Sequence, residues 1–303
     1  MRLVSYNILD GGEGRADPLA EVLEAQRPDI VALIEADEQT VVERIAKRLS
    51  MDFIIGQGRN HSVALLSRWP ITQSINHAGL RASPSPGIPG EGRGEGDSER
   101  RASLPDQNHP HPAVPELKAD RERGPESSTP RISRCFLETS VLDPAGTEWP
   151  IGVVHLPAGA TEADEEARIR DLAIILDLME EHRLANRPHI LCGDFNANAP
   201  YQKIDPTRCK IKTQQAWKAN GNQLPRRVIE ALIGVGYTDT YCARHDEQIE
   251  MIGSFDTQTP GQRVDYIFAF SVERARINNA WVEQDRLAKY ASDHFPIGVE
   301  IHP

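Results

Sequence analysis

The chain has 303 residues, 39% of them hydrophobic, which is enough to bury a full core in one large domain or two. Its 34 basic and 45 acidic residues give a formal net charge of −11, which argues against binding long nucleic acid without a local basic patch. The four cysteines form no CxxC pair and the N-terminal residues contain no long apolar run. We therefore expect no zinc site, disulfide framework or membrane insertion, and a monomer in the cytoplasm.

The first part of the chain alternates between strand and helix patterns. Apolar strands are expected at residues 2–8 and 29–36, with amphipathic helices at 18–27 and 40–49. Short strands should follow within residues 51–56, 62–69 and 71–76, separated by Gly, Asn-His and Trp-Pro turns. The first strand, helix and strand form a β-α-β unit.

An insertion is expected from Arg81 to Arg131. This segment holds nine prolines and six glycines but no Phe, Tyr or Trp. It offers too little apolar surface to offset the entropy of ordering, so we expect a disordered or loosely packed loop. A tolerated surface loop is favoured over a substrate lid or a partner-binding arm.

The second half resumes with a hairpin of strands at residues 134–142 and 148–156. Thr161 should cap a long helix over 162–183, and a strand follows at 189–195. A polar stretch at 201–227 delays the next helix, at 226–236, and the last strands are expected at 263–270, 275–283 and 296–301. The alternation alone suits a doubly wound parallel sheet equally well, but the late run of strands favours mixed sheets.

Polar side chains end several of these apolar runs. They are Asn7, Glu35, His155, Asp194, Asn196, Asp265, Asp293 and His294. Strand ends are rigid and face a common edge, which is how a sheet builds a site. Carboxylates and carboxamides without thiolates favour Mg²⁺ or Mn²⁺, while two histidines with carboxylate partners can transfer protons and stabilise anions. Hydrolysis of a phosphate ester needs both.

The ordered motifs SYN, IEAD, VVHLP, GDFNA, RVDYI and SDHFP resemble the endonuclease/exonuclease/phosphatase superfamily, from Arg2 to Ile301 apart from the insertion. The resemblance implies a single domain over residues 1–303. Its fold would be an α/β, deoxyribonuclease I-like four-layer sandwich of two packed mixed β-sheets flanked by helices. It also implies Mg²⁺-dependent hydrolysis of phosphodiesters by in-line attack of an activated water.

The resemblance also implies roles for the residues that match its motifs. Glu35 and Asn7 would hold the metal, and Asp293 would complete its shell or orient His155. Asp194 would orient or deprotonate the attacking water, Asn196 would hold the scissile phosphate, and His155 would donate to it. Asp265 would accept a hydrogen bond from His294 and raise its pKa. By strand alternation Asn7 and Leu9 share a face and Asp10 points away, unless a bulge intervenes.

The duller alternatives for these residues are structural. Glu35 could cap a helix or form a salt bridge, Asp194 and Asn196 could form a turn, and His155 could be a satisfied structural residue. Glu35, Asp194 and His294 are all present, which disfavours an inactive binding module. A zinc-dependent phosphoesterase would need His/Asp-rich pairs such as HxD or GNHE, and the chain has none.

The sequence feature that bears on the substrate class is a basic stretch, residues 201–227. It carries seven basic residues against one acidic residue. Within it, Lys210 and Lys212 are candidate contacts to nucleic acid, with Tyr201 and Trp217 available for stacking. Arg263 is a further candidate for binding phosphate, or it pairs with a carboxylate. The same cluster would also suit an inositol phosphate or a phospholipid head group.

Overall fold

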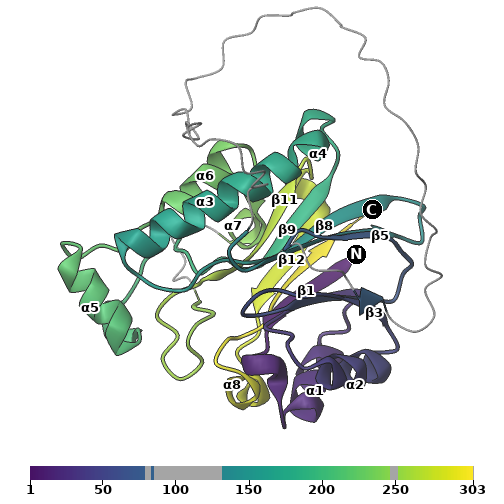
Figure 1. Ribbon diagram of the computed structural model, residues 1–303, viewed down its shortest axis with the longest axis horizontal. Helices are drawn as coiled ribbons and strands as arrows, with labels where there is room; N and C mark the ends of the chain where they lie inside the picture. The colour runs from purple at the N-terminus through teal and green to yellow at the C-terminus, as the bar shows by residue number, and fades with distance from the viewer. Residues whose placement is uncertain (79–82, 85–131, 246–251, 303) are drawn as a thin grey trace, which may run out of the picture.

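The computed structural model describes residues 1–78, 83–84, 132–245 and 252–302, in which two mixed β-sheets pack together with helices on their outer faces (Figure 1). The predicted fold class is confirmed. Apart from residues 83–84, the expected insertion at 81–131 lies outside the described residues. Within the described residues, no helix is long and apolar enough to cross a membrane.

The first sheet carries the N-terminus. Its strands, in spatial order, are β12 (Ile277–Val282), β13 (Ile297–Ile301), β1 (Arg2–Asn7), β2 (Ile30–Ile34), β4 (Val63–Ser67), β3 (Asp52–Gly56) and β6 (Ser83–Pro84). Strands β1 and β2 run parallel, with Asn7 opposite Ile34 at their ends. The other pairs are antiparallel. Asn7 and Glu35 are therefore delivered to one edge.

The second sheet delivers three further polar residues in one row. Its strands, in spatial order, are β10 (Thr238–Asp239), β11 (Asp265–Phe270), β9 (His189–Asp194), β8 (Glu148–His155), β7 (Cys135–Leu142) and β5 (Ile71–Asn76). His155 is opposite Asp194 in the parallel pair β8 and β9, and Asp194 is opposite Asp265 in the antiparallel pair β9 and β11. The expected hairpin is β7 and β8, which pair antiparallel.

Glycine is required at position 193, one residue before Asp194. Its φ is 139°, and a Cβ there would lie 2.0 Å from the carbonyl oxygen of Val154 on the neighbouring strand. Only a residue without a side chain fits so close to another backbone. Gly193 thus lets β9 approach β8 where the two strands present His155 and Asp194.

The helices cover both sheets. Those of the described residues are α1 (Ala16–Ala25), α2 (Gln39–Leu49), α3 (Glu162–Leu178), α4 (Glu180–Leu184), α5 (Ile211–Ala219), α6 (Arg227–Gly234), α7 (Thr240–Arg244) and α8 (Arg286–Ala291), with 3₁₀ turns at Asp10–Gly12, Pro206–Arg208 and Arg274–Arg276. Helices α1 and α2 contribute to the main core together with both sheets. Helices α3 and α6 form a second core on the outer face of the second sheet.

Three helical features differ from the sequence prediction. The long helix has its expected cap, since Thr161 and Asp164 form a capping box, but it ends at Leu178 instead of continuing to 183. Helix α5 lies inside the stretch expected to be irregular, and it buries only Thr213 and Ala216. Helix α8, of six residues, lies where no helix was predicted. Helices that bury so little leave almost no hydrophobic periodicity to detect.

Candidate active site

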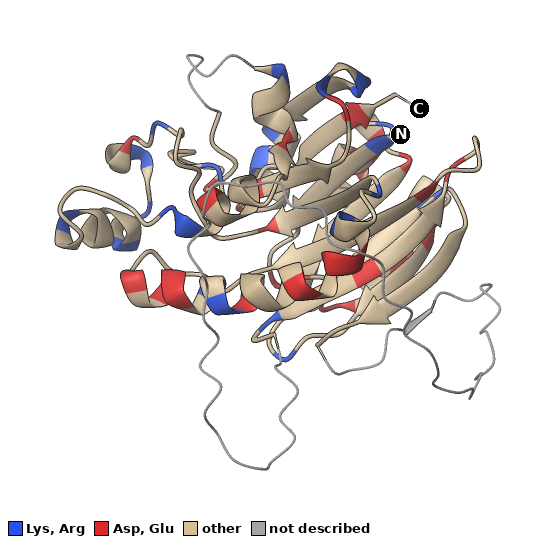
Figure 2. Cartoon of the chain, turned by 90° about the horizontal axis from the view of Figure 1, so that it is seen from above, with Lys and Arg blue, Asp and Glu red and all other residues tan. Residues whose placement is uncertain are grey.

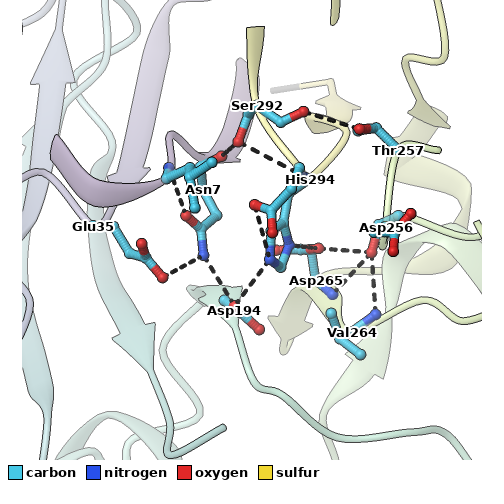
Figure 3. A network of polar contacts seen from close by, with 12 residues as sticks. Asn7, Glu35, Asp194, Asp256, Thr257, Val264, Asp265, Ser292 and His294 are labelled. Atoms are coloured by element: carbon cyan, nitrogen blue, oxygen red, sulfur yellow. Dashed lines mark hydrogen bonds and ion pairs between the residues drawn. The ribbon is translucent and has the colours of Figure 1, made fainter. Parts of the chain in front are cut away.

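The strand-end residues of both sheets meet in one network (Figure 3). Asn7 connects the sheets: its amide nitrogen donates to Glu35 Oε1 at 3.3 Å and to Asp194 Oδ2 at 3.1 Å. Its amide oxygen accepts from the backbone N–H of Leu9 at 3.0 Å. The backbone oxygen of Asn7 accepts from the Ser292 hydroxyl at 2.7 Å, which fixes the loop that carries His294.

His294 is held by a buried carboxylate. Its Nδ1 lies 2.9 Å from Asp265 Oδ2, and the same oxygen accepts from the Ser254 hydroxyl at 2.6 Å. On the other side of the ring, Nε2 lies 3.7 Å from Asp194 Oδ2. Burial disfavours the imidazolium, but the charges of Asp265 and Asp194 outweigh it and raise the pKa of His294 to about 10. His294 is therefore an imidazolium at neutral pH.

His155 has the opposite character. Its Nε2 accepts a hydrogen bond from Arg134 Nη1 at 2.8 Å and lies 3.9 Å from both Glu35 Oε1 and Asp194 Oδ2. Burial, together with the positive charge of Arg134, lowers the pKa of His155 well below its ordinary value. Its Nδ1 has no hydrogen-bond partner among the described residues. His155 is a neutral imidazole.

Asp194 lies between the two imidazoles. Burial and the neighbouring Asp265 raise the pKa of its carboxyl group. From their spacing of two residues, Asp194 and Asn196 would project to the same side of an extended strand, but β9 ends at Asp194 and Asn196 has a φ of 48°. The backbone N–H of Asn196 donates to Asp194 Oδ1 at 2.8 Å, while its amide nitrogen donates to the Leu156 carbonyl at 3.0 Å. The pair forms a turn.

Asp10 also departs from the prediction. Strand β1 ends at Asn7, and Leu9 and Asp10 have φ angles of 56° and 45°, so strand alternation does not apply. The backbone N–H of Asp10 donates to Glu35 Oε2 at 2.9 Å. Side-chain ligand atoms of Asp10, Glu35 and His61 lie within 4.8 Å of one another, a grouping that could hold a cation.

His61 was not identified in the sequence. Its Nδ1 lies 2.9 Å from Asp37 Oδ2, and this hydrogen bond raises the pKa of His61. Its ring lies 5.5 Å from that of His155. Arg134 was missed as well, and only the register that puts its neighbour Cys135 opposite His155 could have indicated it.

Asp293 contacts the basic stretch. Its Oδ2 pairs with Lys210 Nζ at 3.1 Å, and its Oδ1 lies 4.0 Å from His294 Nε2. For the alternative prediction, that Asp293 orients His155, the described residues show no hydrogen bond or ion pair between the two side chains. Lys210 Nζ lies 4.2 Å from the centre of the Phe255 ring, which packs 4.6 Å from the ring of His294. Lys210 is thereby tied to the His294 side of the site.

Arg263 is not a phosphate contact. It is 1% exposed, and its Nη2 pairs with Asp239 Oδ2 at 2.5 Å inside the protein. Tyr201 donates to the same carboxylate at 2.6 Å, so its ring is not free for stacking. For Arg263 the structure has the alternative, a carboxylate pair, with a buried partner in place of a surface one. A sequence does not say which way a side chain points. Lys212 is exposed, as expected of a candidate contact.

A family model described as the endonuclease/exonuclease/phosphatase family matches residues 4–294. Compared by sequence with curated proteins, the chain has no match. Among solved structures, an AP endonuclease from Archaeoglobus fulgidus is similar, with a TM-score of 0.63 at 15% identity over 99% of each chain.

Two further structures are similar at comparable distance. The catalytic domain of Xenopus laevis APE2 has a TM-score of 0.62 at 17% identity, over 99% of this chain and 91% of that chain. The 3′ phosphatase NExo from Neisseria, bound to a product DNA hairpin, has a TM-score of 0.60 at 17% identity over 100% of each chain. These likenesses show the fold, and the family match spans nearly the whole chain. The chain therefore belongs to the endonuclease/exonuclease/phosphatase family and is a metal-dependent phosphoester hydrolase of the nuclease/phosphatase type.

Proposed function

We propose that the protein hydrolyses phosphodiesters in the manner of a nuclease, with Mg²⁺ as its cofactor and Mn²⁺ as a substitute. The observation that carries the proposal is the position of Asp194, 3.7 Å from the imidazolium of His294 and 3.1 Å from the Asn7 amide that bridges to Glu35. A carboxylate with a raised pKa is a better proton acceptor, so Asp194 takes the proton of the attacking water. His294 stabilises the negative charge that develops on the phosphate oxygens.

The donor set fits a hard divalent cation. Glu35 presents one carboxylate oxygen toward Asn7 and the other toward the backbone of Asp10, and its side chain is 14% exposed. Glu35 with Asn7 and Asp10 would hold the ion, and Asp293 remains a predicted ligand. The bound ion would supply Lewis-acid stabilisation of the phosphate and of the leaving oxygen. Arg134 lies on the same side of the site as Glu35 and would donate to phosphate oxygens, while His155, whose Nε2 accepts from Arg134, would hold the guanidinium in place. Donation by His155 itself stays a prediction.

Nucleic acid is the substrate class we favour, because Lys210 and Lys212 of the basic stretch lie next to the catalytic residues. The neighbour bound to a product DNA hairpin points the same way. Inositol phosphates and phospholipid head groups offer the same anionic chemistry and belong in the substrate panel. Monomeric state and cytoplasmic location stay predictions of the sequence.

The test is hydrolysis of a chromogenic phosphodiester by the purified protein with Mg²⁺ or Mn²⁺, before and after exhaustive treatment with EDTA. We expect chelation to abolish turnover. Glu35→Gln should lower it at least ~100-fold, as expected when charge stabilisation at the phosphate is lost. Asp143→Asn is the matched control, because Asp143 is also a buried carboxylate but lies at the far end of the hairpin of β7 and β8. Full activity after chelation would contradict the proposal.

A further inference from the structure

Two hollows flank the candidate active site, and both are lined by Lys210. The first, of about 390 Å³, is lined by Leu9, Arg15, Lys289, Tyr290 and Asp293, among others. The second, of about 580 Å³, includes Asn196, Asn198, Lys212, Phe255 and Gln262 in its lining. Asp293 thus lines the first hollow and Asn196 lines the second. Asp293 and Asn196 both belong to the candidate site, so each hollow adjoins it at a different residue. Figure 2 shows basic residues on and beside α5, which lines the second hollow.

The first hollow offers an exposed ring beside cations. Tyr290, at the end of α8, is 68% exposed. Its neighbour Lys289 forms no ion pair with any residue that the structure describes. Arg15 is held in place by hydrogen bonds to the carbonyl oxygens of Ala291 and Leu9. An exposed aromatic ring next to fixed positive charge is suited to stack a base and attract its phosphate.

Each acidic residue of the first hollow has one carboxylate oxygen engaged, whereas Asp293 Oδ1 has no hydrogen-bond partner among the described residues. Asp256 Oδ1 accepts from the backbone N–H groups of Gln258 and Thr259, both at 2.9 Å, and Asp293 pairs with Lys210. They offset part of the positive charge without presenting a free carboxylate pair to a ligand.

The second hollow offers carboxamides instead of a free ring. Asn198 and Gln262 are 7% and 9% exposed, and the side-chain oxygen of each has no hydrogen-bond partner among the described residues. Lys212 is exposed and forms no ion pair within the described part of the chain. The start of α3, on the same wall, is already satisfied by its own capping box and adds no anion site. Carboxamides are suited to donate to and accept from base edges and sugar hydroxyls.

We propose that the two hollows hold nucleotides on opposite sides of the scissile phosphate of a single-stranded nucleic acid, so that the protein cuts within the strand. This rests on the proposed phosphodiesterase activity and deepens it. A phosphomonoester or a terminal nucleotide would need one hollow only, whereas a chain that passes the catalytic residues must leave on both sides. Single strands fit because Tyr290 can stack only on an unpaired base.

The first experiment uses circular single-stranded DNA and circular RNA, which have no ends, with the wild-type protein and Mg²⁺ or Mn²⁺. The chromogenic diester is assayed in parallel. Linearisation of either circle supports the inference and tells DNA from RNA. Hydrolysis of the diester with both circles intact would overturn the inference and leave the proposed function standing. Inactivity toward the diester and toward both circles would overturn both.

The second experiment measures kinetics on a linear oligonucleotide of the cleaved type. Tyr290→Ala should raise KM at least about 10-fold and lower kcat by a smaller factor, because one stacked base is lost. Tyr290→Trp should restore KM. Lys47→Ala is the control, since Lys47 is an exposed lysine on α2 and lines neither hollow. An unchanged KM for Tyr290→Ala would remove the first hollow from substrate binding.

Discussion

Replacing Asp265 by asparagine tests whether the charge of His294 matters for turnover. The substitution keeps the shape of the side chain and a hydrogen-bonding oxygen for Ser254 and His294, but it removes the buried negative charge. The imidazolium would then keep the carboxylates of Asp194, at 3.7 Å, and Asp293, at 4.0 Å. We expect the pKa of His294 to fall and the rate to fall with it.

The size of the effect follows from the geometry. The surrounding carboxylates raise the pKa of His294 from 6.5 to about 10, and such a difference corresponds to ~5 kcal/mol in favour of the imidazolium. Asp265 is the largest favourable contributor. If its loss removes about half of that energy, the stabilisation available to the transition state falls by ~2–3 kcal/mol, which lowers kcat by roughly 30- to 150-fold.

The assay combines kinetics with a direct titration. We would measure kcat and KM on the chromogenic diester between pH 5 and pH 9, and follow the His294 ring by NMR over the same range. Because the folded-state pKa is raised above the unfolded value, the stabilisation by His294 is complete below pH 6.5 and is lost only as pH rises through about 10. The ring should therefore titrate above this range in the wild type and toward its upper end in Asp265→Asn.

The result that would refute this reasoning is a folded Asp265→Asn protein whose kcat stays within ~3-fold of wild type. Asp143→Asn again serves as the control for loss of a buried carboxylate, and it should lower the melting temperature without changing kcat. If Asp265→Asn lowers the melting temperature but leaves the titration of the His294 ring unchanged, the role of Asp265 is purely structural.

Three further predictions concern other parts of the molecule. Asp239→Asn should lower the free energy of unfolding by about 3–5 kcal/mol in denaturant titrations and leave kcat unchanged, because the buried guanidinium of Arg263 loses its carboxylate partner. A raised KM with normal stability would contradict a structural role for the Arg263–Asp239 pair. His189 is buried with both ring nitrogens hydrogen-bonded, and its pKa is lowered to about 4, so stability should fall as pH drops from 6.5 toward 4, by on the order of 3 kcal/mol in all. A pH series of melting curves on wild type and His189→Gln checks this, and equal slopes would count against it. Lys210→Glu combined with Lys212→Glu should raise KM for nucleic acid and flatten its salt dependence; an unaltered salt slope would remove both lysines from binding.

The sequence predicted which strands carry the candidate site, because its polar residues stand at the ends of apolar runs. Strand ends lie at the edge of a sheet, so these residues were expected there. His155, Asp194 and Asp265 each follow or begin an apolar run, and the register of β8, β9 and β11 puts them side by side. The resemblance to the family predicted that two sheets pack against each other, which cannot be read from any local sequence pattern. Only then could Asn7 be expected beside Asp194, 187 residues later.

Local departures from regular geometry were not predictable in the same way. Strand alternation assumes an extended backbone, and it fails at Asp10 and Asn196, where φ is positive. Arg134 and His61 carry no motif of their own. Each lies just before a strand, β7 or β4, that pairs with a strand leading to a motif residue. The direction of Arg263 depends on a carboxylate 24 residues away, which a sequence pattern does not encode.

The two histidines of the motif set look equivalent in the sequence but differ in charge for a reason that lies in their partners. His294 faces two buried carboxylates, which stabilise its imidazolium. His155 is just as buried, but its nearest partner is the guanidinium of Arg134, which stabilises the neutral ring. Asp194 lies 3.7 Å from Nε2 of His294 and 3.9 Å from Nε2 of His155, and the second of these nitrogens accepts a hydrogen bond from Arg134. Asp194 therefore faces one charged and one neutral imidazole, and Arg134, which no motif contains, contributes to that difference.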